Sequence, residues 1–228
     1  MDNYVCVNGK KTPLSADQIK KLGFSVDSPL EDLVKRVRIG EHPFKPGKVI
    51  GDFGMKFKIL GYNHDVSAET YNNHGTVTLM CLNAPVHRMH EGSCPGGWED
   101  SELRKWLNDE HFRTLPVGLQ ELIRPTIRKS TDAEGHYHTT TDFLFLPTES
   151  ELFGSAIYSA RECGSRYPVF CTSKDRILVD EDGSRSTWWT ASALAGNTTY
   201  FVLVYYTGLV HYSGASNALR APFCFQLS

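Results

Sequence analysis

Two closely spaced histidines are the first side chains in this sequence whose types and positions could do chemistry. His136 and His138 lie in the segment EGHYHTTTD, which ends at Asp142. On a β-strand both imidazoles would point to one face, and imidazoles with a carboxylate can bind a metal ion. The spacing fixes no third ligand, however, and the segment has the character of an exposed polar loop after a helix. We favour the loop and predict no metal and no cofactor.

A second pair, His87 and His90 in PVHRMHEG, gives the same result. The two would be neighbours on a helix, but the surrounding prolines and glycines favour a loop. The motifs G-x-S-x-G, the P-loop and G-x-G-x-x-G are absent. A catalytic Cys–His pair stays open, because its members need not be near in sequence, but nothing selects one. We therefore predict that the protein is not an enzyme and has no catalytic residues.

The six cysteines are scattered and form no C-x-x-C pair, so zinc-finger spacing is absent. In a chain made in the cytoplasm, this pattern favours free and mostly buried thiols, with a structural disulfide as the alternative. The cysteines are Cys6, Cys81, Cys94, Cys163, Cys171 and Cys224.

Charge and hydropathy exclude several classes of protein. The chain has 24 Lys and Arg against 26 Asp and Glu in 228 residues, a formal net charge of -2. A nucleic-acid-binding domain usually needs a basic face, so we expect no nucleic acid partner. No apolar run approaches the roughly 20 residues of a membrane span. The N-terminal residues lack a basic stretch followed by an apolar one, so we expect no signal peptide.

Residues 1–42 are predicted to form a small N-terminal module. A short strand and turn in YVCVNG precede two helices, which start at Ser15 and Ser28. The second helix has proline at its first position and glycine after its last turn. Two prolines and a glycine over 43–47 then place the module boundary near residue 42.

Beyond this boundary the pattern changes to strands separated by loops. Alternating apolar residues in KVIGDFGMKFKILGY predict strands with one buried face, and GTVTLMCL predicts another strand. A helix in SELRKWLN precedes a second helix that Pro125 breaks, a short strand at 143–146, and a helix with a capping box that starts at Thr148. Residues 160–187 have loop composition. This mixture predicts the α+β class.

The segment from Thr190 to Phe225 has an unusual composition. Its only charged residue is Arg220, and it is rich in Tyr, Ser, Thr, Asn and Gly. Antibody paratopes have a similar composition, because tyrosine offers contact area and the small polar residues offer adaptable hydrogen bonds. The alternative is a plain β-hairpin whose aromatic side chains are buried, which the run YFVLVYY partly supports.

The pair Trp188 and Trp189 leaves two interpretations open. Adjacent residues on a strand point to opposite faces, so one tryptophan could anchor the core while the other lies under a binding surface. Equally, both could belong to the scaffold.

Four motifs, in order along the chain, resemble a phage- and prophage-associated family with a C-type-lectin fold of the formylglycine-generating-enzyme type. They are SELRKWLN at 101–108, DFLFLPTESE at 142–151, WWTAS at 188–192 and GASNALRAPFCF at 214–225. The family includes the variable proteins of diversity-generating retroelements. The resemblance covers about residues 48–228. It implies a C-type-lectin-like, ligand-binding domain over 43–228, with a variable segment at about 190–225.

In that family a retroelement rewrites adenines in the C-terminal coding segment, and the resulting codons never encode Lys, Glu, Gln, Met or Trp. All five are absent between Thr190 and Phe225, although chance or β-structure would also produce this absence. The scaffold that the resemblance implies is Trp188, Trp189, Val204, Gly208, Val210 and Arg220. The exposed, ligand-binding residues that it implies are Ala191, Ala193, Leu194, Asn197, Tyr200, Tyr205, Tyr206, Leu209, His211, Tyr212 and Ser213.

Two departures from the family limit the resemblance. The chain has the order Leu219, Arg220, Ala221, Pro222 where the family has Val-Arg-Pro-Ala, which leaves the local turn open while Arg220 keeps its role as an anchor. Oxidases of this fold class use paired cysteines and copper, and we exclude that activity because only Cys224 lies in the terminal segment. Calcium-dependent sugar binding is not expected, because this segment has no Asp or Glu.

The resemblance implies a target-binding protein of the receptor or adhesin type. Its target would be a protein or glycan on a cell surface, with other virion proteins or further copies of the chain as additional partners. We expect it in a phage tail, or in the cytoplasm before assembly. The alternatives are a structural tail-tip or baseplate protein without diversified binding, and an enzyme of unknown chemistry.

Overall fold

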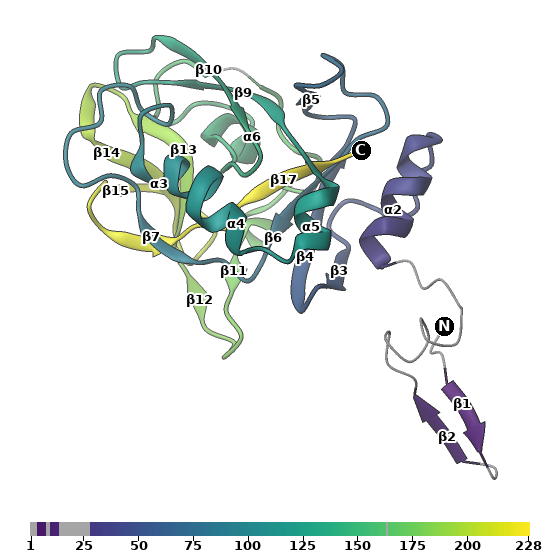
Figure 1. Cartoon of the computed structure of the whole chain (residues 1–228). Helices are drawn as coiled ribbons and strands as arrows, with labels where there is room; N and C mark the ends of the chain where they lie inside the picture. The colour runs from purple at the N-terminus through teal and green to yellow at the C-terminus, as the bar shows by residue number, and fades with distance from the viewer. Residues whose placement is uncertain (1–3, 8–9, 14–27, 163) are drawn as a thin grey trace.

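The protein is a mixed α+β structure dominated by β-strands, as predicted from the sequence (Figure 1). The computed structural model describes residues 4–7, 10–13, 28–162 and 164–228. Two five-stranded sheets contribute many residues to the hydrophobic core, and nearly all strand pairs in the described residues are antiparallel. None of the described helices is long and apolar enough to cross a membrane.

The first large sheet contains the last strand of the chain at an inner position. In spatial order its strands are β3 (Val49–Asp52), β4 (Met55–Tyr62), β6 (Val77–Cys81), β17 (Cys224–Leu227) and β8 (Ile123–Arg124). Phe57 and Ile59 on β4 are buried and alternate with the less buried Lys56 and Lys58, which confirms the predicted alternation for this part of the strand. Because β17 pairs with both β6 and β8, the C-terminal residues are part of the core (Figure 1).

The second large sheet contains the unusual C-terminal segment. Its strands, in spatial order, are β15 (Val210–Gly214), β14 (Asn197–Val204), β13 (Trp188–Leu194), β16 (Ala218–Arg220) and β7 (Val86–Arg88). β13, β14 and β15 form two successive antiparallel hairpins, while β13 and β16 pair in parallel. β15 is an edge strand, whereas β13 is an inner strand that is buried almost throughout.

Smaller sheets complete the β-structure. A three-stranded sheet has the order β10 (Tyr137–Asp142), β9 (Thr126–Thr131) and β5 (Val66–Ser67). Two hairpins pair β11 (Leu178–Val179) with β12 (Arg185–Ser186), and β1 (Tyr4–Val7) with β2 (Lys10–Pro13). The prediction of a loop over 134–142 was wrong for Tyr137–Asp142, which pair with β9, whereas residues 134–136 form the turn before this strand.

The described helices are short, and those predicted at Ser28, in SELRKWLN and at Thr148 start there, whereas Ser173–Arg176 forms a 3₁₀ turn within the predicted loop region 160–187. They are α2 (Pro29–Arg38), α3 (Glu102–Trp106), a π-helical segment (Leu107–His111), α4 (Phe112–Thr114), α5 (Val117–Leu122), α6 (Glu149–Phe153) and a 3₁₀ turn (Ser173–Arg176). Ser28 and Thr148 cap α2 and α6, each with the glutamate of a complete capping box. The helix predicted from Ser15 lies outside the described residues.

The strand predicted at 143–146 is reduced to a single bridge between Phe145 and Cys224. Pro147 follows directly, and the backbone then turns into α6, so the segment has no room to extend a ladder. The module boundary near residue 42 stays a prediction. α2 buries Leu30, Leu33 and Val37 in the same hydrophobic cluster as the two large sheets.

Candidate binding surface

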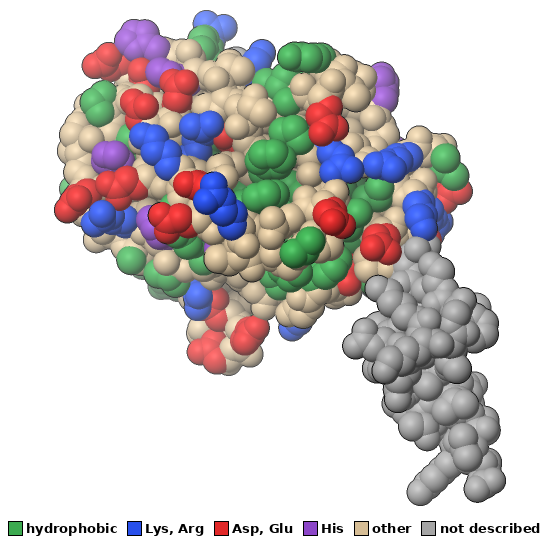
Figure 2. All heavy atoms as spheres, viewed as in Figure 1, with side chains coloured by type: hydrophobic (Ala, Val, Ile, Leu, Met, Phe, Trp, Pro, Cys, Tyr) green, Lys and Arg blue, Asp and Glu red, His purple; other side chains and the backbone are tan. Residues whose placement is uncertain are grey.

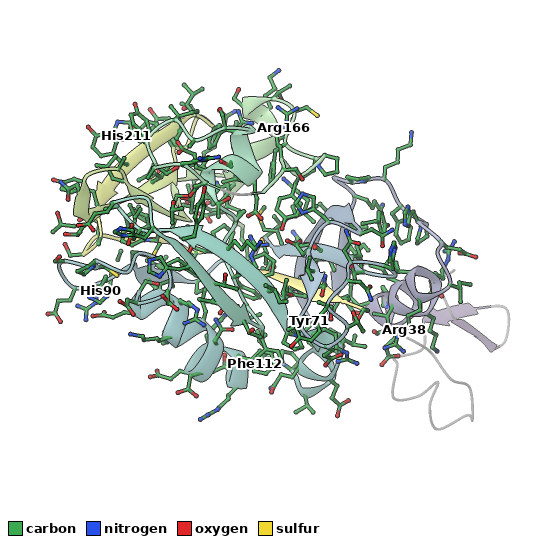
Figure 3. The ribbon with its side chains drawn as sticks, turned by 90° about the horizontal axis from the view of Figure 1, so that it is seen from above. Arg38, Tyr71, His90, Phe112, Arg166 and His211 are labelled. Atoms are coloured by element: carbon green, nitrogen blue, oxygen red, sulfur yellow. The ribbon has the colours of Figure 1, made fainter. Side chains whose placement is uncertain are left out.

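Six aromatic side chains lie together where β14 and β15 form the edge of the second sheet. The five tyrosines among them are 36–44% exposed, and the histidine is exposed as well. Figures 1 and 3 place this edge at the end of the molecule away from α2, with His211 and Arg38 labelled on opposite sides in Figure 3. We call the group the aromatic row: Tyr158, Tyr200, Tyr205, Tyr206, His211 and Tyr212.

The rings of the aromatic row contact one another in sequence. The ring centroid of Tyr205 lies 4.2 Å from that of Tyr206 and 5.7 Å from that of His211. His211 lies 5.3 Å from Tyr212, which meets Tyr200 edge-to-face at 6.0 Å. Such edge and tilted contacts are attractive, because each ring has a negative face and a positive edge. The row is therefore ordered in part by its own contacts.

A buried frame supports the row from below. Phe201–Val204, the second half of β14, is buried on both faces of the strand. At the turn that follows, the Tyr205 amide donates to the Leu209 carbonyl at 2.8 Å. Gly208 has φ +81°, and a Cβ atom here would lie 1.9 Å from the Ser173 carbonyl oxygen. Only glycine fits this position, so the turn that carries Tyr205 is held against the 3₁₀ turn.

The structure separates the predicted ligand-binding residues into three groups. The exposed ones are Tyr200, Tyr205, Tyr206, Leu209, His211 and Tyr212, and the half-buried ones are Leu194, Asn197 and Ser213. The expectation that Ala191 and Ala193 are exposed was wrong, because both are buried in β13. The backbone N–H of Ala191 donates to the Pro147 carbonyl at 3.0 Å, so this part of the strand is covered. These two alanines belong to the frame.

The predicted scaffold residues are all buried or half-buried. Trp188 and Trp189 are both fully buried, and their indole N–H groups donate to the carbonyls of Arg176 and His87. This arrangement supports the interpretation that both belong to the scaffold. Arg220 is half-buried, as expected for an anchor, and donates to the Ala84 carbonyl at 3.1 Å while pairing with Asp180. Val204 and Gly208 are buried, and Val210 is half-buried.

Sequence reasoning missed Tyr158, which reaches the row from a distant loop. Its ring meets that of Tyr212 edge-to-face at 5.1 Å. The loop is held by the buried carboxylate of Glu149, which accepts hydrogen bonds from the backbone N–H groups of Ile157, Tyr158 and Ser159. No local pattern around Tyr158 signals this position, because it depends on an acid in α6.

A second acid beside this loop, Glu162, has a raised pKa because of its surroundings. Glu162 accepts a hydrogen bond from the Ser192 hydroxyl and another from the Ser150 backbone N–H. Burial, aided by the negative charges of Glu149 and Glu151, raises the pKa of Glu162 to about 7. The folded protein therefore binds a proton at Glu162 more tightly than the unfolded chain does.

This shift predicts a pH-dependent stability. The contribution of Glu162 is fully present below about pH 4.5 and is lost as the pH rises through about 7. Glu162→Gln cannot ionise, so its free energy of unfolding relative to the wild type should increase by about 3 kcal/mol between pH 4.5 and pH 8. Urea unfolding at the two pH values measures this change. Glu110→Gln, at an exposed site, is the control, and a pH-independent difference for Glu162→Gln would contradict the prediction.

A buried ion-pair network lies beneath the loop and α6. The Arg128 guanidinium on β9 binds the carboxylates of Asp65 and Glu151, all three being buried. It lies 4.0 Å over the ring of Phe145, and the Tyr167 hydroxyl donates to Asp65 at 2.7 Å. Burial by itself would raise the pKa of Asp65, but the charge of Arg128 holds that pKa well below its usual range.

The cysteines of the described residues are free thiols that differ in burial. Cys81, Cys94 and Cys224 are buried free thiols, Cys171 is an exposed one, and Cys163 lies outside the described residues. They agree with the interpretation of mostly buried free thiols.

The structure separates residues that the sequence analysis grouped as possible metal ligands. Asp142 is buried at the far end of β10 and accepts hydrogen bonds from Trp98 and Arg104, so it does not meet His136 or His138. His87 stacks on Trp106 at 4.5 Å, whereas His90 accepts a hydrogen bond from the Glu102 backbone N–H at 3.3 Å.

Residues 75–227 match the family model described as "Domain of unknown function (DUF6273)". No curated protein and no solved structure matches the chain. The matched region runs from just before β6 to the last residue of β17, and it includes every residue of the aromatic row.

Proposed function

The chain belongs to the DUF6273 family, and we propose that it is a target-binding protein of the receptor or adhesin type whose contact surface is the aromatic row. One observation carries the proposal: six aromatic side chains from the β14–β15 hairpin and the adjoining loop lie exposed and in mutual contact over a buried frame. Tyrosine offers a large amphipathic surface with few rotatable bonds, which suits adaptable recognition.

The buried frame reduces the conformational entropy that the protein loses when it binds a target. Phe201–Val204 is buried, Gly208 fixes the turn, and Glu149 holds the loop of Tyr158, so little of the surface must be ordered on contact. Leu209 and Ile157 are exposed beside the tyrosines and add apolar area. Exposed apolar groups gathered in this way often mark an interaction site.

The charge distribution favours a protein or glycan target on a cell surface. The only charge between Thr190 and Phe225 is Arg220, which is already paired with Asp180. Figure 2 shows basic and acidic side chains interspersed on the face in view, with no uniformly basic patch there. Recognition by the row would rest on aromatic contact and hydrogen bonding rather than on steering by net charge.

We further propose a C-type-lectin-like fold and a phage-associated variable protein as the finer identity. The four ordered motifs support this identity, as does the absence of Lys, Glu, Gln, Met and Trp between Thr190 and Phe225. Diversified positions would be the exposed and half-buried candidates. Ala191 and Ala193 are removed from that set, because a side chain larger than alanine would have to enter the frame.

A display library tests this proposal directly. With Tyr205, Tyr206, Leu209, His211 and Tyr212 randomised together, most yeast-displayed members should stay resistant to protease. Selection against hen egg-white lysozyme as a model target should then yield binders, because the surface tolerates exchange.

The control library randomises the buried segment Phe201–Val204, and most of its members should be degraded, because buried apolar side chains are lost. Equal protease sensitivity of the two libraries would refute the proposal that the aromatic row tolerates exchange on a buried frame. A near-copy of the codons for 190–225 beside a reverse-transcriptase gene would support natural diversification.

A structural virion protein remains the second candidate, favoured by the position of β15. In the described residues β15 pairs with β14 alone, so its outer edge is available to a strand from a neighbouring subunit. Assembly through this edge would produce oligomers in solution and co-fractionation with particles. A monomer that binds a target would favour the first candidate.

A further inference from the structure

We infer that the turn between β9 and β10 is a binding site for Zn²⁺ or a similar first-row transition-metal ion, formed by Asp132, Glu134, His136 and His138. The inference is independent of the proposed target-binding function. It rests on the positions of the donor atoms, on the groups that orient them and on the rigidity of the turn.

The donor atoms of Asp132, Glu134 and His136 already have the spacing of a metal coordination shell, and His138 Nε2 lies beside the Asp132 carboxylate. Asp132 Oδ2 lies 3.0 Å from His136 Nδ1 and 3.1 Å from His138 Nε2. Glu134 Oε2 lies 3.6 Å from His136 Nδ1, and the donor atoms of these two residues and Asp132 lie within 4.8 Å of one another. Ligands bound to zinc at about 2.0–2.2 Å in a tetrahedron lie about 3.3–3.6 Å apart, so small shifts would close this shell.

Groups outside the shell hold the donors in orientation. The other ring nitrogen of His138, Nδ1, lies 2.5 Å from Glu99 Oε2. A metal-binding histidine usually donates its second N–H to a carboxylate in this way, which fixes the tautomer and the ring. Asp132 Oδ1 accepts the backbone N–H groups of Glu134 and His136, both at 2.9 Å, which holds its second oxygen between the two imidazoles.

The turn itself is anchored at both ends. The ladder pairs Thr131 with Tyr137 and Ser130 with His138, and the Ala133 carbonyl accepts the Gly196 backbone N–H at 2.7 Å. Donors on so constrained a turn lose little freedom on binding a metal.

The surroundings leave the site open to an ion. Asp132 is buried, His138 is half-buried, and His136 and Glu134 are exposed. Figure 2 shows histidine and acidic side chains at the upper edge of the molecule, where Figure 1 places β10. Two imidazoles with carboxylates suit zinc and its neighbours, whereas calcium and magnesium prefer oxygen ligands.

The sequence pattern drew attention to the right histidines but to the wrong acid. Asp142 lies on the same strand as His138 but at the opposite end of β10. The antiparallel return of the chain instead brings Asp132, at the end of β9, beside both imidazoles. We therefore replace the expectation of an exposed loop with a metal-binding turn.

Isothermal titration of the untagged, EDTA-treated and dialysed full chain with ZnCl₂ tests the site. We expect saturable binding of one equivalent, with loss of that binding in the double variant His136→Ala/His138→Ala. Glu99→Gln changes no ligand, yet it should weaken binding about tenfold to a hundredfold because it no longer orients His138. Zinc should also raise the melting temperature of the wild type but not that of the double variant.

His74→Ala and Cys171→Ser are the matched controls, since each removes an exposed donor elsewhere, and both should bind zinc as the wild type does. Absence of saturable binding, or binding that survives the double variant, would overturn the inference. Loss of binding in either control would do the same. If the double variant is unstable without metal, Glu99→Gln decides, and an unchanged affinity in that variant refutes the site.

Discussion

Replacing Tyr205, Tyr206 and Tyr212 together with alanine is expected to abolish target binding while leaving the protein folded. The three residues supply most of the ring contacts within the aromatic row, and each is exposed. Binding would be measured on an array of immobilised glycans and bacterial surface proteins, with wild-type chain as reference. Every signal that the wild type gives through this surface should disappear in the variant.

The melting temperature of this variant shows whether the tyrosines form an exposed surface or part of the hydrophobic core. Ring pairs at exposed positions contribute about 0.5 kcal/mol each, so the melting temperature should fall by only about 5 °C. Phe201→Ala is the matched control, because it removes one fully buried aromatic ring from the adjoining strand. We expect this single change to cost about 3–5 kcal/mol and to lower the melting temperature by about 10 °C or more.

Unfolding of the triple variant would contradict the proposed function, since it would make the tyrosines part of the core. Retained array binding by a folded triple variant would equally exclude the row as the contact surface. Circular dichroism and thermal melts on the same preparations separate the two outcomes.

Replacing Arg128 with methionine is expected to destabilise the protein by about 3–5 kcal/mol at pH 7. The change leaves the carboxylates of Asp65 and Glu151 buried without their cation. The deficit should become smaller in acid, because the unpaired carboxylates of the variant can then take up protons. In the wild type, the low pKa of Asp65 adds stability above its unfolded pKa, and that stability is lost as the pH falls through the folded value.

Two further variants isolate the electrostatic cause. Arg124→Met removes a less buried arginine whose guanidinium lies 3.8 Å from the Glu69 carboxylate, and it should cost about 0–1 kcal/mol. Adding Asp65→Asn to Arg128→Met should recover part of the loss, because one buried charge disappears. Guanidinium unfolding at pH 7 and pH 4 measures all four proteins. A deficit that does not change with pH would show that packing against Phe145, rather than charge, explains the loss.

Local features of the fold were predictable from the sequence. The capping box at Thr148 depends on residues three positions apart and forms as predicted, and Ser28 caps its helix as predicted. The alternation in β4 likewise reports its buried face directly. The aromatic residues of β14 and β15 could be selected from composition because tyrosines and small polar residues are concentrated there.

Features that depend on distant partners were not predictable. The segment of β10 is polar enough to resemble a loop, and only its pairing with β9 makes it a strand. Ala191 and Ala193 have side chains that suit an exposed strand as well as a tightly packed one, and the neighbours of β13 decide between these. Tyr158 joins the row because Glu149, in another element, fixes its loop.

The inner position of β17 has a consequence for the proposed diversification of the segment before it. Phe225 and Leu227 are buried, and the Gln226 side-chain amide donates to the Asp65 carbonyl at 2.7 Å. A frameshift or premature stop within 190–225 would remove this strand and expose the two strands beside it. Under the proposed diversification, we therefore expect truncated or frameshifted copies to misfold and be degraded, so that only copies with an intact reading frame persist.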